Sequence, residues 1–260
     1  MITVTHNDLQ AAAEALAQRL TSDGLIVAST GAGMSRESGI PTFRGAEGVW
    51  RQYRAEDVAT PEAFRQAPRL FWEFNDHLRQ LMVAAAPNDG HLALARFQRS
   101  LSGAELHIVT QNIDRLHEIA GSTGVIHLHG DIVRVVCPAC GFADNDYPVP
   151  APDCPPVCSC GSYLRPDIVL FGEPLPENDL ERAFALAETC DAILVVGTSM
   201  NVQPAASLPF VALDHGALVV EVNPEQTVLT ASAHHSLRGT AAEVLPALLD
   251  TVSKITGGAQ

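Results

Sequence analysis

The chain has 260 residues and a net charge of −14, with 47% hydrophobic and 18% charged residues. A chain of this length and apolar content can bury a core of its own, which excludes disorder as its main state. The acidic balance argues against nucleic acid as a partner, because phosphate binding needs clustered Lys and Arg. The sequence shows no apolar run of the about 18 residues that span a membrane, and we expect no secretory leader. These features predict a cytoplasmic protein with no membrane partner, and nothing in them requires more than a monomer.

Short apolar runs alternate with helical stretches along the chain. Helical spacing is found at Asp8–Leu20, Pro61–Ala85, His91–Leu101, Glu177–Thr189 and Ala241–Ile255. The apolar runs, typical of buried strands, are Leu25–Ala28, Leu106–Val109, Val125–Leu128, Ala192–Val196 and Ala217–Val222. Because these runs are continuous rather than alternating, they predict an α/β fold with a Rossmann-like parallel sheet and helices on both faces.

Two segments interrupt this alternation. Residues 41–87 are mostly helical, and residues 131–165 are rich in Cys, Pro, Asp and Gly. Both are expected to be insertions into one α/β domain. The expected division is therefore a Rossmann-like domain made of residues 1–40, 88–130 and 166–260, a helical insertion at 41–87 and a small zinc-binding lobe at 131–165.

Cysteines are concentrated in the second insertion. Cys137-x-x-Cys140 is followed, after a gap of 17 residues, by Cys158-x-Cys160. Two close pairs at this separation are typical of a four-thiolate zinc site, and four cysteines with no open position predict a structural ion. The second pair is shorter than usual, so Cys154 is an alternative to Cys158 as the third ligand.

A glycine-rich segment, Gly31-Ala32-Gly33-Met34-Ser35, follows the first predicted strand. Such turns let the backbone approach a phosphate, although an ordinary tight turn also needs glycine. Gly197-Thr198-Ser199 and Asn223-Pro224-Glu225 follow two other strands, and three such strand ends favour a nucleotide site. Ordinary dehydrogenases bind the ribose through an acid about 20 residues further on, at the end of a second strand. In this sequence that region is Trp50–Asp57, and no strand precedes it, so we expect another mode of binding.

Polar side chains also follow the second and third strands. Thr110-Gln111-Asn112-Ile113-Asp114 combines amides with a carboxylate, which can recognise a carboxamide. His127-Leu128-His129-Gly130 ends the third strand, and alternation predicts that both histidines share one face. His129 is the candidate base because of its place at a strand end, although a lone histidine is more often structural.

Taken in this order, these motifs resemble those of the sirtuins, which are NAD-dependent protein-lysine deacylases. The resemblance extends from Gly24 to Pro246. The motifs that carry it are Gly31–Ser35, Gly39-Ile40-Pro41-Thr42-Phe43-Arg44, Thr110–Asp114, His129-Gly130, the four cysteines, Arg165-Pro166, Val169–Glu173, Gly197–Ser199 and Asn223.

The resemblance implies a role for each matching residue. His129 would be the general base and Asn112 its catalytic partner, while Phe43 would shield the reacting ribose carbon. Cofactor contacts would come from Gly31, Ala32, Gly33, Ser35, Arg44, Gln111, Ile113, Asp114, Gly197, Thr198, Ser199, Asn223 and Ala241. Val169, Phe171, Gly172 and Glu173 would flank an acyl-lysine peptide added as a strand between two lobes.

The resemblance also implies the chemistry. The acyl oxygen attacks the ribose carbon, nicotinamide leaves, and His129 helps a ribose hydroxyl complete acyl transfer. Free lysine, nicotinamide and O-acyl-ADP-ribose are the products. NAD is thus a co-substrate, one zinc ion is structural, and acylated proteins or peptides are the partners.

The acyl preference depends on two departures from the family pattern. Thr42 stands where many members carry Asp, which hints at acidic acyl groups such as succinyl. Those members also have a Tyr and an Arg in the acyl channel, where Phe74 and His77 are expected here. Neither side chain offers the guanidinium fork that grips a carboxylate, so we expect acetyl to be favoured.

Other activities remain open at this stage. A desuccinylase or demalonylase and a mono-ADP-ribosyltransferase are alternatives within the same family. Outside it, the alternatives are an NAD-dependent dehydrogenase with a zinc lobe and a non-catalytic protein that binds ADP-ribose or acyl-lysine.

Overall fold

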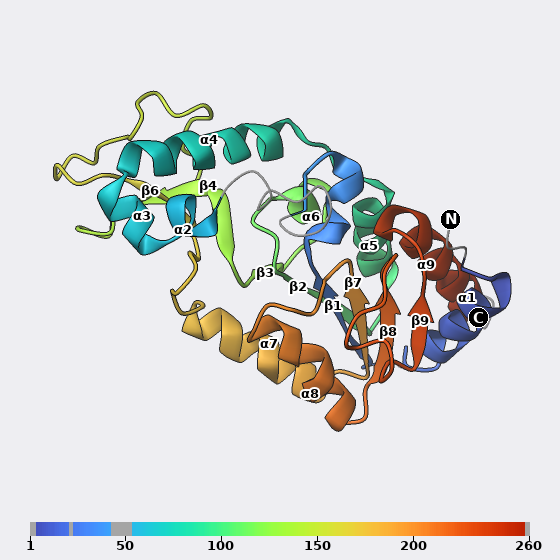
Figure 1. Cartoon of the computed structure of the whole chain (residues 1–260). Coiled ribbons are helices and arrows are strands. Elements are labelled where there is room, and N and C mark those ends of the chain that lie inside the picture. The colour runs from blue at the N-terminus through green and yellow to red at the C-terminus, as the bar shows by residue number, and fades with distance from the viewer. Residues whose placement is uncertain (1–3, 21–22, 43–53, 258–260) are drawn as a thin grey trace.

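The computed structural model describes residues 4–20, 23–42 and 54–257. Its larger sheet has six strands in the order β3-β2-β1-β7-β8-β9, all parallel. The strands are β1 (Leu25–Thr30), β2 (Glu105–Thr110), β3 (Ile126–His127), β7 (Ala192–Val196), β8 (Leu218–Val222) and β9 (His235–Leu237). The predicted α/β fold is confirmed, and the sheet lies at the centre of the molecule (Figure 1).

Helices cover both faces of this sheet (Figure 1). One apolar core joins it to α1 (His6–Ala17), α5 (Asp89–Ser100) and α9 (Ala241–Gly257). A second core lies on the opposite face, under α7 (Glu177–Thr189) and α8 (Leu208–Asp214). All five residues of both β7 and β8 are buried, as expected for central parallel strands.

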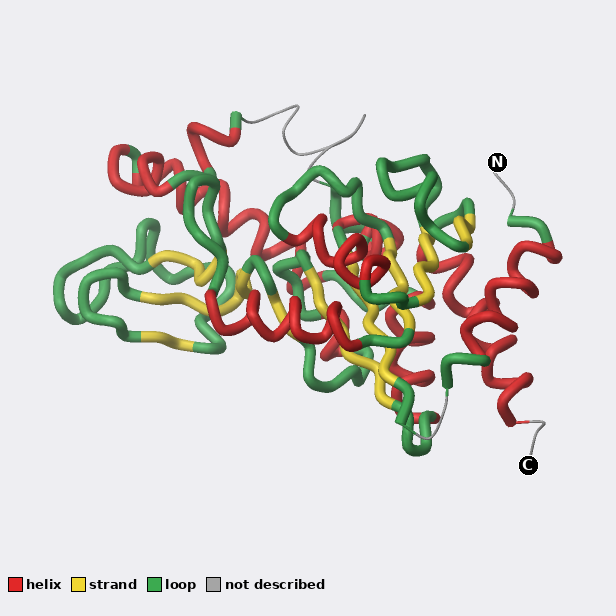
Figure 2. The backbone as a smooth tube through the Cα atoms, turned by 90° about the horizontal axis from the view of Figure 1, so that it is seen from below, coloured by secondary structure: helices red, strands yellow, loops and turns green. Residues whose placement is uncertain are grey.

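A smaller three-stranded antiparallel sheet lies to one side, in the order β5-β4-β6 (Figures 1 and 2). Its strands are β4 (Gly130–Val136), β5 (Ala143–Asp144) and β6 (Arg165–Ile168), and the helices beside it are α2 (Ala55–Val58), α3 (Pro61–Gln66) and α4 (Pro68–Ala84). The two predicted insertions therefore pack on each other as one small lobe. Trp72 of α4 joins them, because its indole N–H donates to the Leu164 carbonyl at 2.6 Å.

The structure differs from the sequence expectations in three places. The helix expected at Pro61–Ala85 is divided into α3 and α4 at Ala67, since a residue before proline is disfavoured in the helical region. β3 has two residues rather than four. β9 has three residues, two of them polar, so no apolar run marked it. No helix in the described part of the chain is both long and apolar enough to cross a membrane.

Candidate active site

A cavity of about 900 Å³ lies where the carboxyl ends of the parallel strands face the small lobe. Residues that follow five different strands of the larger sheet contribute to its lining, whereas the predicted Ser35 and Asp114 line a small adjoining pocket instead. From the large lobe these include Gly31, Ala32, Gly33, Gln111, Asn112, Ile113, His129, Gly197, Thr198, Ser199, Asn223 and Ala241. From the small lobe come Ala59, Phe74, Asn75, Leu78 and Ile168, and the segment Val169–Glu173 follows β6.

Gly33 and Gly197 bring two strand ends into backbone contact. The Gly33 amide donates to the Gly197 carbonyl at 2.7 Å. A Cβ on Gly33 would lie 2.7 Å from the Gly197 Cα, which is closer than real side chains approach. Gly197 also has a φ of +61°, a region that favours glycine. Both glycines are therefore required by this packing, and they leave bare backbone along the cavity wall.

Ser35, Asn112 and Asp114 form a buried polar group at one end of the cavity. The Asn112 side-chain amide donates to Ser35 Oγ at 3.0 Å, and Ser35 Oγ donates to Asp114 Oδ2 at 2.9 Å. Burial raises the pKa of Asp114, although hydrogen bonds from the Leu116 amide and Ser35 oppose this effect. The three side chains hold one another in fixed orientations, so the Asn112 side chain is presented to the cavity in a single geometry.

His129 presents one ring nitrogen to the site. Its Nδ1 lies 2.8 Å from the Gln111 carbonyl oxygen, which can only accept a hydrogen bond. The proton of the neutral ring is therefore on Nδ1, and Nε2 carries a free lone pair. Burial lowers the pKa of His129, opposed by the hydrogen bond to Gln111, so the ring is neutral at pH 7. A neutral, oriented imidazole is the form that a general base requires.

Thr198 organises the opposite end of the cavity. Its carbonyl accepts from the Asn223 side chain at 2.7 Å, and its hydroxyl accepts from Gln111 at 3.2 Å and from the Met200 amide at 3.3 Å. Three strand ends are thereby tied together by one residue. Ser199 beside it is exposed.

The segment after β6 links the two lobes. The Val169 amide donates to the His129 carbonyl at 2.9 Å, which joins this segment directly to the strand end that carries the candidate base. Phe171 and Gly172 are exposed. Glu173 accepts two hydrogen bonds of 2.7 Å from Arg165. Burial raises the pKa of Glu173, but the Arg165 contacts outweigh this effect and lower it. Glu173 thus fixes the segment from within.

The structure separates the two residues that the sequence placed in an acyl channel. Phe74 is 5% exposed and lines the cavity, but His77 is exposed on α4 and does not line it. The structure does not place His77 in the lining as expected, because the helix turns this position away. Asn75 and Leu78 line the cavity instead, and the spacing of Leu78 one turn from Phe74 could have identified it. Phe43 and Arg44 lie outside the described residues.

The four predicted zinc ligands come together in the small lobe. The Sγ atoms of Cys137, Cys140, Cys158 and Cys160 all lie within 4.8 Å of one another. Two of the pairs are 3.5 and 3.6 Å apart, close to the about 3.8 Å between sulfurs in a tetrahedral zinc site with Zn–S bonds of about 2.3 Å. The geometry fits a zinc ion. Cys154 is exposed and lies outside this group, so the alternative third ligand is not supported.

Each of the two cysteine pairs is followed by a glycine that closes a tight turn. Gly141 follows Cys140 and Gly161 follows Cys160, with φ of +74° and +91°. The Gly141 amide donates to the Cys137 carbonyl at 3.0 Å, and the Gly161 amide donates to the Cys158 carbonyl at 2.8 Å. The shorter spacing of the second pair therefore still closes a tight turn around a metal.

The fold and site define an α/β protein with a nucleotide-type cavity between a parallel-sheet lobe and a small cysteine-rich lobe. The model of the Sir2 family matches residues 31–204. An NAD-dependent protein deacylase of Caldanaerobacter subterraneus subsp. tengcongensis is 50% identical over 220 residues, which is 84% of this chain and 90% of that protein. An NAD-dependent protein deacylase of Pyrococcus furiosus is 46% identical over 91% of this chain and 96% of its own length. The chain belongs to the Sir2 family.

Solved structures agree with this assignment. A Sir2 homologue bound to ADP-ribose superposes with a TM-score of 0.87 at 43% identity, covering 94% of this chain and 98% of that one. A Sir2 protein bound to a myristoylated histone peptide superposes with a TM-score of 0.77 at 33% identity, covering 98% of this chain and all of that one.

Proposed function

We propose that this protein removes acyl groups from lysine side chains of other proteins at the expense of NAD, releasing nicotinamide and O-acyl-ADP-ribose. The observation that carries the proposal is His129, a neutral and oriented imidazole in a cavity built from glycine-rich strand ends. The deacylases to which the chain is similar support the same reaction.

NAD, as co-substrate, supplies the ribose carbon that accepts the acyl oxygen and the nicotinamide that leaves. His129 acts through Nε2, which takes the proton of a ribose hydroxyl so that this hydroxyl can attack the acyl carbon. Gln111 keeps the other ring nitrogen protonated and thereby prevents the wrong tautomer. Asn112 and Asp114 orient the nicotinamide end, and Ile113 beside them adds an apolar wall.

The remaining cavity residues bind and exclude water. Gly31, Ala32 and Gly33 allow the pyrophosphate to approach the backbone, while Gly197, Thr198, Ser199, Asn223 and Ala241 surround the adenosine end. We assign Phe43 and Arg44 to the reacting ribose and the phosphates on the family pattern. Closure around the reacting carbon matters because water would otherwise capture it.

The acylated peptide enters between the lobes as an added strand beside Val169, Phe171 and Gly172. Its acyl group points toward Phe74, Asn75 and Leu78 of α4. These three side chains are uncharged, so a neutral acyl group such as acetyl is favoured over succinyl. The zinc ion, held by four thiolates, has no open position and stabilises the lobe that carries α4 and β6.

One assay tests the reaction. The protein is incubated with NAD and acetyl-, succinyl- or myristoyl-lysine peptides, and nicotinamide and peptide mass are measured. We expect steady-state release of nicotinamide and of deacylated peptide to depend on the acetyl peptide and to fall about 10²–10⁴-fold in His129→Ala, the usual loss when a general base is removed. A transfer of ADP-ribose onto protein would instead favour the ribosyltransferase alternative, and turnover of succinyl peptide alone would contradict the acyl preference.

His77→Ala is the matched control. Because His77 is exposed and outside the cavity, its removal should not change the ratio of acetyl to succinyl turnover. Acyl binding by His77 would appear as a change in that ratio.

A further inference from the structure

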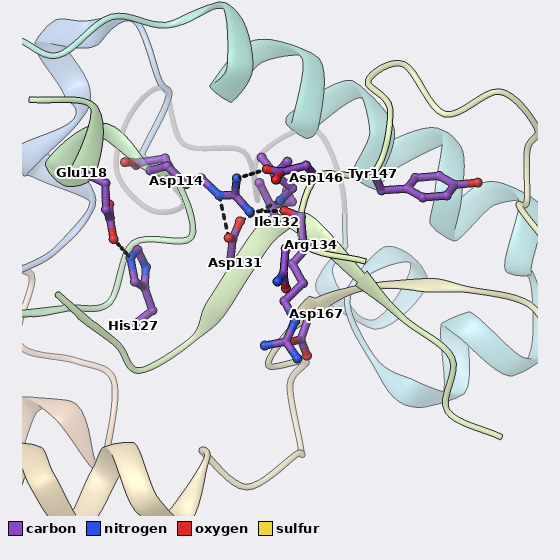
Figure 3. Close-up of polar contacts among 12 residues, drawn as sticks. Asp114, Glu118, His127, Asp131, Ile132, Arg134, Asp146, Tyr147 and Asp167 are labelled. Carbon is purple, nitrogen blue, oxygen red and sulfur yellow. Dashed lines mark hydrogen bonds and ion pairs between the residues drawn. The ribbon is translucent and has the colours of Figure 1, made fainter. Parts of the chain in front are cut away.

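A second histidine lies behind the site, two residues before His129. His127 ends β3, and its side chain is only 16% exposed. It does not line the cavity. Its ring lies against α6 (Leu116–Ile119), where Glu118 points toward it (Figure 3). The reaction described above gives this side chain no role.

Both ring nitrogens of His127 face groups that have no proton to give. Nε2 lies 2.7 Å from a carboxylate oxygen of Glu118, and Nδ1 lies 3.2 Å from the backbone carbonyl oxygen of Asn112. A neutral imidazole has one N–H and can satisfy only one of these acceptors. Only the imidazolium, with a proton on each nitrogen, makes both hydrogen bonds.

The surroundings favour that charged form. Burial lowers the pKa of His127, but Glu118 and the Asn112 carbonyl outweigh burial and raise it, and Asp131 of β4 acts in the same direction. Asp114 also interacts electrostatically with the charged His127 ring, while His117 of α6 is buried and neutral.

Two other elements pack around β3. Thr110 of β2 pairs with His127 in the sheet. The helix α7 contributes Ala183 and Ala187 to the core that contains Ile126.

The Asn112 carbonyl is the link from His127 to the cavity. The amide N–H of Asn112 donates to Thr110 Oγ1 at 3.0 Å, and its side chain donates to Ser35 at 3.0 Å. His127 supplies the third contact to this residue. If His127 lost a proton, the stronger bond to Glu118 would be kept, and a ring lone pair would face the Asn112 carbonyl.

We propose that His127 is a positioning residue that acts as an imidazolium, clamping the backbone of Asn112 so that the Asn112 side chain holds the nicotinamide end of NAD. This inference rests on the proposed function of the same cavity. Deprotonation of His127 as the pH rises then releases Asn112 and weakens NAD binding and turnover. His129 must be neutral and His127 charged, so activity requires opposite states of two histidines on one strand.

The test is the pH dependence of NAD binding, measured by calorimetry, together with kcat/KM for NAD. For the natural protein we expect NAD affinity to fall about fivefold to tenfold as His127 loses its proton, the equivalent of one hydrogen bond. We call the fall in affinity at high pH the alkaline limb of the pH profile, and the fall at low pH the acid limb. His127→Gln, which is neutral at every pH, should bind NAD with the weaker affinity throughout and should not show the alkaline limb. Glu118→Gln should move that limb to lower pH without moving the acid limb that His129 sets.

The matched control is His107→Gln. His107 lies 2.8 Å from Glu105 on β2, but this pair is on the surface and far along the strand from the cavity. The His107→Gln variant should therefore keep both the acid limb and the alkaline limb. An alkaline limb that persists unchanged in both His127→Gln and Glu118→Gln would overturn the proposal.

Binding and turnover separate the two hypotheses. If acyl-dependent nicotinamide release were missing while NAD affinity still showed the His127-dependent limb, the proposed function would fail and the positioning role would stand. If release occurred and the alkaline limb did not depend on His127, the proposed function would stand and the positioning role would fail.

Discussion

The two lobes that enclose the cavity are stabilised by different combinations of contacts. The large lobe has two aliphatic cores and backbone contacts between strand ends, such as that of Gly33 with Gly197. The small lobe has smaller apolar clusters, around Phe74 and Trp72, and in addition a buried arginine that donates to carbonyls and to a carboxylate, and four thiols that meet at one point. Apolar burial is distributed over many residues, whereas a metal and a few ionic contacts concentrate stability in single side chains. The small lobe should therefore fail at individual positions where the large lobe would not.

The largest expected effect is the loss of one zinc ligand. Cys158→Ser removes a thiolate from the cluster, and because zinc binding is folding free energy in a lobe of this size, the small lobe should lose its structure. Thermal unfolding of the variant should then show the large-lobe transition alone, with a smaller unfolding enthalpy than in the natural protein. Elemental analysis should find one zinc per chain in the natural protein and much less in the variant.

Cys154→Ser is the matched control for that experiment. Cys154 is exposed, lies near the Arg69 carbonyl and is four residues before Cys158. We expect full zinc content and unchanged unfolding. Zinc loss in Cys154→Ser, or retention in Cys158→Ser, would contradict the ligand set.

The next largest effect should come from Arg79 on α4. Its side chain is fully buried and donates to the carbonyls of Ile132 and Tyr147 and to Asp76. Arg79→Met leaves these acceptors unpaired inside the lobe. Breaking a buried ionic contact in this way costs about 3–5 kcal/mol, which denaturant unfolding measures.

A surface arginine of the same helix provides the comparison. Arg69 pairs with Glu73 one turn along, at 2.9 Å, with both side chains mostly exposed. Arg69→Met should leave the denaturation midpoint unchanged. Equal losses in the two variants would mean that the helix, and not the buried contacts of Arg79, determines the result.

The same contrast explains what the sequence could predict. β7 was predicted with its correct bounds because all its residues are apolar and buried, and strand ends in a parallel sheet meet at one edge. The residues around the cavity followed from that rule. In contrast, Arg115 bonds Asp131 and Asp146, which are 16 and 31 residues away, and no local pattern marks such contacts. His77 was misplaced because helical phase depends on what packs against α4.

The smallest of these effects concerns the large lobe, where one buried histidine departs from the apolar rule. His91 of α5 is fully buried, its ring centroid lies 4.9 Å from that of His117, and its Nε2 has no hydrogen-bond partner among the described residues. Burial lowers its pKa to about 4, against about 6.5 in the unfolded chain. Below pH 6.5 the unfolded chain binds a proton at His91, whereas the folded chain does not until the pH approaches 4. The stability present above pH 6.5 is therefore lost as pH falls, by about 3 kcal/mol at pH 4.

His91→Gln isolates this contribution. The ring accepts from the Asn88 amide as part of a capping box, and glutamine can fill the same position without titrating. Urea unfolding at pH 7 and pH 4 should show that the variant loses about 3 kcal/mol less than the natural protein, while the carboxylates act equally in both. An equal acid loss would place the sensitivity elsewhere. A smaller loss of stability in the variant would mean that protonation of one buried side chain destabilises even the large lobe.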